Sequence, residues 1–274
     1  MKPWCRIIAQ LMLLMSIAFA GSENEGKTGL AFLKIGVGAR AAGMGEAYTA
    51  VAGDAFATYW NPAGLLAAGQ SNVGFQHNEW LLDVRGEFAA LQFKWARSSL
   101  AFHVYNVNVG DIEVRTAPTA NPLEKTSAHY ASAGISYART FGERLGLGVT
   151  VKYLFEKLFV YDAAGVAVDV GFRYAEILPQ VTIAGAVQHL GSMGKLNRES
   201  SRLPTTLRFG AVYAFSRPMG PARILLAADA VKPVEENLRL HVGTEVALWE
   251  QLILRAGGIS GSESRTVSLG VGIR

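Results

Sequence analysis

The stretch from Leu145 to Phe155, LGLGVTVKYLF, decides the fold class of this sequence. Its odd-numbered positions are all apolar or aromatic, whereas the even-numbered positions are Gly, Gly, Thr and Lys until Leu154 departs from the pattern. Successive side chains of a β-strand point to opposite faces of a sheet, so alternation with a period of two indicates a strand with two different faces. The stretch therefore predicts a strand with one apolar face and one face of small or polar residues.

The same alternation recurs in short segments from about residue 72 onward. It is clear in residues 166–174, 238–248 and 267–273, where apolar residues alternate with small or polar ones. The pattern predicts twelve strands, near residues 72–81, 87–96, 99–108, 129–139, 145–155, 165–174, 180–189, 205–215, 222–230, 238–248, 252–259 and 265–273.

Two architectures are built from such strands, a soluble sandwich or barrel with an apolar core and a membrane barrel with an apolar exterior and a polar lumen. The second face here is rich in Gly, Ala and Ser rather than in Lys, Glu and Thr, which suits a crowded barrel interior. Aromatic residues lie toward strand ends, as an interfacial girdle requires, at Tyr153, Phe155, Phe172, Tyr174, Tyr213, Phe215 and Trp249. The sequence therefore favours an all-β transmembrane antiparallel barrel over a soluble all-β domain.

The connections between the predicted strands differ in length. We expect long loops from Gly110 to Ala128 and from Gly191 to Pro204, whereas the turn at residues 141–144 is short. Long loops on one rim and tight turns on the other are typical of outer-membrane barrels.

The N-terminus has the layout of a secretory signal peptide. Lys2 and Arg6 precede an apolar run from Ile7 to Phe19, and Ala18-Phe19-Ala20 has the small residues of a signal-peptidase site. The alternative is an anchor helix, but the run is short for a membrane span and no basic stop-transfer cluster follows it. We therefore expect residues 1–20 to be cleaved near Ala20 and the mature chain to reach the bacterial outer membrane.

Composition excludes several classes of protein. The 274 residues are 50% hydrophobic and 18% charged, and their single cysteine, Cys5, lies within the expected signal peptide. A disordered chain, a disulfide-stapled miniprotein and thiolate chemistry in the mature chain are therefore excluded. The mean hydropathy is +0.21 but only one segment is a continuous apolar run, which disfavours a helical membrane protein. The net charge of +4 is scattered along the chain, so no nucleic-acid partner is expected.

Residues 29–66 lack the alternation and are rich in Gly and Ala. They contain, in order, Gly38-Ala39-Arg40, Gly43-Met44-Gly45-Glu46-Ala47, Asp54 and Trp60-Asn61-Pro62-Ala63-Gly64-Leu65. This run resembles the N-terminal signature of the PorV/PorQ family of outer-membrane proteins, which are related to the FadL-type long-chain fatty acid transporters. A weaker likeness extends from Gly191 to Gly210, through Leu203-Pro204 and Leu207-Arg208-Phe209-Gly210.

The resemblance implies a barrel of about fourteen strands whose N-terminal segment folds into the lumen as a hatch. We accordingly expect a plug at residues 21–70 and the barrel at residues 71–274. Twelve strands are visible and the sequence ends at Arg274 without a terminal aromatic residue, so we expect a final hairpin to be missing from it.

The residues expected to serve the hatch, in a structural or gating role, are Gly38, Arg40, Gly43, Gly45, Asp54, Trp60, Asn61 and Pro62. The glycines permit close packing of backbone against a barrel wall, and Pro62 restricts the turn after Asn61. Asp54 either caps a short helix or turn or pairs with a lumenal arginine. Arg40 is either a lumenal ion-pair partner or solvated.

Signals for catalysis and cofactors are weak. Gly36 to Ala41, with Asp54 downstream, fits a loose dinucleotide pattern, but a β-meander follows instead of the required βαβ unit. The five histidines are isolated from one another, so no zinc site is indicated. A nucleophile elbow and a P-loop are also lacking, and we expect neither an enzyme nor a cofactor.

Two functional hypotheses remain. The first, from the PorV side of the resemblance, is an accessory barrel of the type IX secretion pathway that binds exported cargo at its extracellular loops. The second, from the FadL likeness, is a passive channel for hydrophobic small molecules. The strand positions predicted to face the lumen include Lys152, Asp169, Arg173, Arg239, His241 and Glu245. These polar and charged residues favour the first hypothesis over an apolar channel. The expected partners are outer-membrane lipid, with exported proteins or secretion-machinery components, or hydrophobic small molecules.

Overall fold

The computed structural model describes residues 29–80, 83–115, 122–197, 199–216, 220–249, 251–261 and 266–274. The expected signal peptide lies outside the described residues. Four short helical elements come first: η1 (Ala31–Lys34), α2 (Ala39–Gly43), α3 (Ala57–Trp60) and η2 (Pro62–Ala67). None of the helices in the described ranges is both long and apolar enough to cross a membrane.

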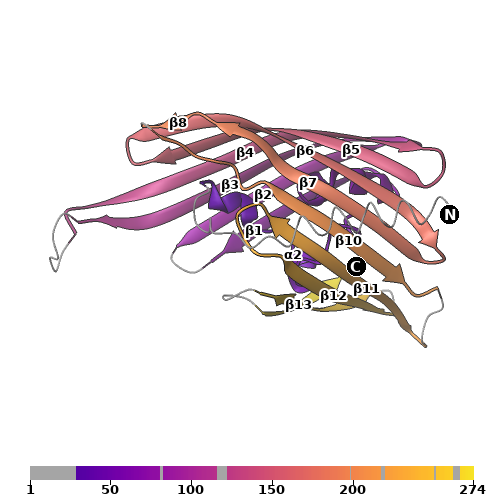
Figure 1. Ribbon diagram of the computed structural model, residues 1–274. Coiled ribbons are helices and arrows are strands. Elements are labelled where there is room, and N and C mark those ends of the chain that lie inside the picture. The colour runs from indigo at the N-terminus through magenta and orange to yellow at the C-terminus, as the bar shows by residue number, and fades with distance from the viewer. Residues whose placement is uncertain are drawn as a thin grey trace.

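One antiparallel sheet of twelve strands follows, in the order in which the strands occur along the chain (Figure 1). Its strands are β1 (Asn72–Glu79), β2 (Val84–Lys94), β3 (Ser98–Val114), β4 (Glu124–Phe141), β5 (Leu145–Leu158), β6 (Tyr161–Leu178), β7 (Val181–Met193), β10 (Thr206–Ala214), β11 (Ala222–Pro233), β12 (Arg239–Leu248), β13 (Leu252–Ser260) and β14 (Val267–Ile273). Two short strands, β8 (Lys195–Leu196) and β9 (Glu199–Ser200), form a separate hairpin. All twelve predicted strands are thus present, whereas the described residues do not supply the fourteen that the resemblance implied.

The two faces of the sheet differ as the alternation predicted. On β5 the residues from Gly146 to Leu154 alternate between buried and exposed, and the exposed positions are the apolar ones. Val151 is 51% exposed and Tyr153 is 55% exposed, whereas Lys152 between them is 1% exposed. Leu154, which interrupts the sequence pattern, points inward and joins the buried core. An apolar face that is exposed along the strands is stable when it faces lipid rather than water.

The sheet curls around the N-terminal segment, which we define as residues 29–70. At one end of the strand order, the Phe56 ring lies against Gly74 of β1, and at the other end Gly43 of α2 lies against Gly270 of β14. Between these ends, η2 contacts β4, β5 and β6. The buried core consequently lies on the inner side of the sheet and is made largely by the N-terminal segment.

Aromatic rings of the segment and of the wall make up much of that core. Tyr59 packs edge-on against Trp60, Phe88 and Tyr105, at centroid distances of 5.1, 6.3 and 6.2 Å. Phe32 stacks on Tyr130 at 5.4 Å. Edge-to-face aromatic pairs at these distances stabilise a packed interior beyond the area that they bury.

The connections between strands define two rims. Because the sheet is an antiparallel meander, the β1–β2, β3–β4, β5–β6, β7–β10, β11–β12 and β13–β14 connections share one end, which we call the long rim. The other five connections form the short rim, and the β2–β3, β4–β5 and β12–β13 connections there each have three residues. The difference is not uniform, because the β5–β6 turn at the long rim has two residues and the β10–β11 connection at the short rim has seven.

The two predicted long loops are shorter than expected. Strands β3 and β4 continue pairing beyond residue 110, through Ile112↔Thr126 to Val114↔Glu124, after a register shift between Val109 and Ile112. Similarly, β7 runs to Met193, and the β8–β9 hairpin occupies part of the stretch up to Pro204. The prediction of loops was wrong here because polar residues and a local bulge hid the strand pattern, although ladder hydrogen bonds do not require an apolar face.

Candidate functional site

The Asn61-Pro62 turn is the first of several polar contacts that join the N-terminal segment to the inner face of the sheet. Asn61 is 0% exposed. Its Nδ2 donates to the carbonyl oxygens of Thr49 at 3.2 Å and Phe172 at 3.1 Å, and its Oδ1 accepts from the backbone N–H of Ala63 at 3.1 Å. One side chain therefore caps η2 and binds both the segment and β6.

Glycines on β5 and β6 make room for this turn. A Cβ added at Gly148 would overlap the backbone of Ala63 and lie 2.8 Å from the carbonyl oxygen of Pro62. A Cβ at Gly171 would overlap Asn61 Oδ1 and lie 3.2 Å from Pro62 Cδ. The small residues on the inward face are therefore required where the segment approaches the wall backbone.

Asn61→Ala tests the turn. The change removes three buried hydrogen bonds and leaves two carbonyl groups without that donor, so we expect the free energy of unfolding to fall by ~2–4 kcal/mol. The measurement is the urea midpoint of the detergent-solubilised barrel. Asn72→Ala is the control. Asn72, at the start of β1, also accepts a hydrogen bond from the segment, from the backbone N–H of Ala55, but it is only partly buried. Equal midpoint shifts in the two variants would contradict a special role for Asn61.

A second contact involves Asp229 of β11. Its Oδ2 accepts from the backbone N–H groups of Tyr48 at 3.0 Å and Thr49 at 2.8 Å, and from the Thr49 hydroxyl at 2.6 Å. Beside it, the Arg208 guanidinium of β10 lies 4.6 Å from the Trp60 ring centroid and donates to the Glu46 carbonyl at 3.2 Å. The carboxylate and the guanidinium thus hold residues 46–49 to the wall by charge-assisted hydrogen bonds and a cation–π contact.

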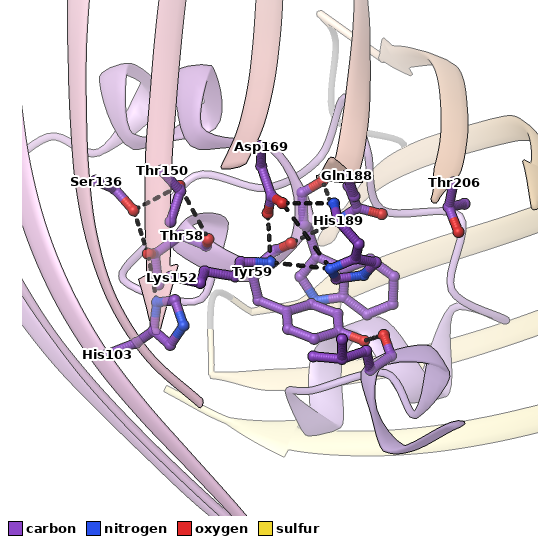
Figure 2. Close-up of polar contacts among 12 residues, drawn as sticks. Thr58, Tyr59, His103, Ser136, Thr150, Lys152, Asp169, Gln188, His189 and Thr206 are labelled. Atoms are coloured by element: carbon purple, nitrogen blue, oxygen red, sulfur yellow. Dashed lines mark hydrogen bonds and ion pairs between the residues drawn. The ribbon is translucent and has the colours of Figure 1, made fainter. Parts of the chain in front are cut away.

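A third contact centres on a buried ion pair (Figure 2). Lys152 Nζ of β5 lies 2.5 Å from Asp169 Oδ2 of β6, and the two side chains are 1% and 0% exposed. The backbone N–H of His189 donates to Asp169 Oδ1 at 2.8 Å, and His189 Nδ1 lies 3.3 Å from Lys152 Nζ. Lys152 Nζ is also 5.7 Å from the Tyr59 ring centroid, so this pair of wall charges faces the segment.

The neighbouring Gln188 of β7 ties the same region to the backbone of α3. Its Nε2 donates to the carbonyl oxygens of Tyr59 at 2.6 Å and Trp60 at 3.2 Å. Those carbonyls lie at the helix C-terminus, where intrahelical donors are lacking. The wall therefore caps α3.

A fourth contact is a chain of hydroxyl groups (Figure 2). Thr58 of α3 shares hydrogen bonds with His103 Nδ1 of β3, at 2.8 Å, and with Ser136 of β4. Ser136 in turn bonds the Thr150 hydroxyl at 2.7 Å. Three adjacent wall strands thus converge on one threonine of the segment.

The predicted glycines contact the strands at the two ends of the strand order. The backbone N–H of Gly38, at φ 93°, donates to Gln76 Oε1 of β1 at 2.5 Å. Gly43 would place a Cβ 3.0 Å from the Cα of Gly270, and Gly45, at φ 62°, would place one 2.7 Å from the Gly258 nitrogen. A side chain is disfavoured at Gly45 by both its backbone conformation and the space available.

Arg40 and Asp54 have different surroundings. Arg40 makes a bidentate ion pair with Glu245 of β12, at 2.8 Å to each carboxylate oxygen, and Arg255 binds the same carboxylate at 2.7 Å. Burial lowers the pKa of Arg40, but Tyr48 and Glu245 more than reverse this and hold the pKa above its usual range.

Asp54 Oδ1 accepts from the backbone N–H of Phe56 at 3.0 Å, which is a local capping bond. Burial raises the pKa of Asp54, and the nearby Arg40 guanidinium lowers it in part.

Seven of the eight predicted residues contact the sheet, at different places, so the eight do not form one cluster. The hydrogen-bond partners of Asp54, which are Phe56 and Tyr48, belong to the segment itself. Trp60 lies at its centre, where its Nε1 donates to the Val37 carbonyl at 2.8 Å. The wall partners His103, Asp229 and His189 were not singled out from the sequence. The sequence shows only that these residues occupy strand positions that face the lumen. It does not show which residue of the segment each one contacts.

A cavity of about 50 Å³ remains between the segment and β7, β10, β11 and β12. Its lining includes Lys34, Arg208, Arg239, His189 and His241, beside Tyr59 and Trp60. The space is small and its lining is largely polar, so it suits water better than an apolar ligand.

Comparisons with known proteins agree with this architecture. The family model described as "Type IX secretion system protein PorV" matches residues 20–189. Among solved structures, the chain is similar to the "CymD monoaromatic hydrocarbon channel", with a TM-score of 0.56 and 12% identity over 82% of this chain and 83% of that one. At this identity the likeness concerns the fold. A comparison with curated proteins finds no match.

The structural likeness and the strand pattern together confirm the all-β antiparallel barrel fold class, and the family match confirms the resemblance noted in residues 38–65. That match covers more than half of the sequence. The chain therefore belongs to the family of the type IX secretion system protein PorV.

Proposed function

We propose that the protein is an accessory barrel of type IX secretion that binds exported cargo at its long rim, while the N-terminal segment closes the lumen as a plug. The carrying observation is the filled interior, in which buried hydrogen bonds and ion pairs tie the segment to the wall. In this proposal the long rim faces the exterior, as longer connections do in outer-membrane barrels. The signal peptide is cleaved near Ala20, and the chain performs no catalytic step.

The filled interior argues against a passive channel for hydrophobic molecules. Asn61, Lys152 and Asp169 are at most 1% exposed, and their partners cross between the segment and the wall or between wall strands. The cavity of about 50 Å³ is far smaller than the several hundred Å³ typical of a small-molecule site. Passage through the lumen would require this segment to leave its contacts.

The β3–β4 hairpin supports the binding of a protein partner. It extends beyond its neighbours on the left of Figure 1, because β2 pairs only as far as Val109 of β3 and β5 only as far as Ala128 of β4. Beyond these residues no described strand of the sheet pairs with either edge of the hairpin. Unpaired strand edges are ready positions for an extended segment of another chain.

Shortening this hairpin tests the proposal. Residues 110–127 are replaced by Asn-Gly, which joins the paired residues Val109 and Ala128 through a two-residue turn. In cells whose own copy is deleted, we expect the shortened barrel to reach the membrane but to lower the amount of exported cargo at the cell surface at least tenfold. Surface labelling followed by immunoblotting measures the cargo.

The control shortens a connection on the other rim, where residues 215–221 between β10 and β11 are replaced by Asn-Gly. This variant should export cargo normally. Normal export by the long-rim variant would contradict the cargo role. Uptake of an apolar tracer by liposomes that contain the wild-type barrel would instead support the channel hypothesis.

A further inference from the structure

Three exposed arginines lie on neighbouring strands and turns of the short rim. Arg97 belongs to the β2–β3 turn, Arg139 to the end of β4, and Arg144 to the β4–β5 turn. The backbone N–H of Thr140 donates to the Arg97 carbonyl at 2.9 Å, and Ser98 pairs with Arg139 in the ladder. Backbone hydrogen bonds therefore hold the turn that carries Arg97 next to Arg139. Arg144 lies in the following turn, between β4 and β5.

These arginines differ from the basic residues of the long rim in their charge partners. At the long rim, Arg85 lies 3.8 Å from Glu79, Arg115 lies 2.8 Å from Glu113, and Lys125 lies 3.0 Å from Asp111. Within the described part of the chain, no ion pair involves the three short-rim arginines. One Arg144 nitrogen donates to the backbone carbonyl of Glu176 at 3.2 Å, which leaves its charge uncompensated.

Exposed aromatic rings accompany the arginines. Tyr137 and Phe141 flank Arg139 on the outward face of β4 and are 44% and 51% exposed, and Trp95 beside Arg97 is 53% exposed. Such rings occupy the headgroup level of a bilayer, and arginines near them extend into the polar layer. The patch thus combines exposed aromatic rings with guanidinium groups that form no ion pair among the described residues.

We infer that Arg97, Arg139 and Arg144, with Trp95, bind the phosphodiester headgroup of an anionic glycerophospholipid. Guanidinium groups bind phosphate oxygens through paired N–H donors. The negative charge of the phosphate also complements the uncompensated positive charge of the arginines. The patch lies on the outer surface of the wall, so its ligand arrives from the bilayer. The site uses the barrel orientation proposed above but not the cargo role, and it faces the periplasmic leaflet.

Tryptophan fluorescence provides a local test. In a Trp80→Phe/Trp249→Phe background, the remaining mature-chain tryptophans are Trp95 in the patch and Trp60, which is 1% exposed and shielded inside the barrel. The barrel is titrated with mixed micelles containing brominated phosphatidylglycerol or brominated phosphatidylcholine. We expect phosphatidylglycerol to quench Trp95 at a much lower lipid fraction than phosphatidylcholine.

The test variant in this background is Arg97→Gln/Arg139→Gln. Each arginine near a lipid surface contributes about fivefold in affinity. The double variant should therefore raise the fraction of phosphatidylglycerol needed for half-maximal quenching roughly twentyfold to thirtyfold. The control, Arg85→Gln/Arg115→Gln, removes the same charge from the long rim and should leave the titration unchanged. Heat-modifiable gel mobility verifies that both variants are folded.

Three outcomes would overturn the inference. Equal quenching by the two lipids in the wild-type arginine background would show that the patch does not select an anionic headgroup. An equal shift in the control variant would assign the preference to net charge rather than to this patch. Full competition by millimolar inorganic phosphate would make the patch a site for free phosphate rather than for lipid.

Discussion

Lys152→Met is expected to lower the free energy of unfolding by ~3–5 kcal/mol, because it leaves the Asp169 carboxylate buried without its cation. Asp169 is 0% exposed, and the backbone N–H of His189 still donates a hydrogen bond to its Oδ1. The urea midpoint of the detergent-solubilised barrel, followed by its heat-modifiable mobility on gels, measures the loss.

Two further variants separate charge from packing. Lys157→Met alters an exposed lysine of the same strand and should shift stability by less than ~0.5 kcal/mol. Lys152→Met/Asp169→Leu removes both charges and should recover most of the loss, because an apolar pair carries no desolvation cost. A double variant as unstable as Lys152→Met would show that lost packing, rather than the unpaired charge, dominates.

Gly148→Ala is expected to displace the N-terminal segment from the wall. The added methyl group would overlap the backbone of Ala63 and approach the Pro62 carbonyl, and neither can move as a flexible side chain would. We expect a destabilisation of ~3 kcal/mol. In planar lipid bilayers, we also expect ion-conducting openings that the wild-type barrel lacks.

Gly86→Ala is the matched control for this prediction. Gly86 also faces inward, on β2, but its nearest neighbour for an added Cβ is a Tyr105 ring atom at 3.6 Å, an ordinary contact. This variant should remain closed and as stable as the wild type. If the Gly148→Ala barrel also conducts no ions while losing stability, the segment only shifts locally within the lumen. Its proposed role as a plug then loses support.

The strand prediction succeeded because it rests on local geometry. The alternation in residues 145–155 reports two faces of one strand, whatever the strand packs against. The twelve predicted strands were therefore placed within a few residues, although β3, β4 and β6 extend further than expected. The errors fall at the ends of strands, where the alternation in the sequence ends.

The interior contacts could not be predicted in the same way. Lys152 and Asp169 were recognised as inward-facing charges, but their pairing depends on the register between β5 and β6, which places Thr150 opposite Asp169. Asn61 was recognised as part of a motif, yet its acceptor on Phe172 lies 111 residues away. Contacts at such separations follow from the way the whole sheet curls around the segment.

The sequence by itself thus determined the all-β class, the inward and outward faces of the strands and the family, because these depend on local periodicity and on contiguous motifs. The tertiary structure alone decided which wall residues hold the N-terminal segment, where glycine is required and which of the described arginines lack a charge partner. Those features depend on strand register and on the path of the segment inside the sheet, and the same one-dimensional pattern is compatible with many such arrangements.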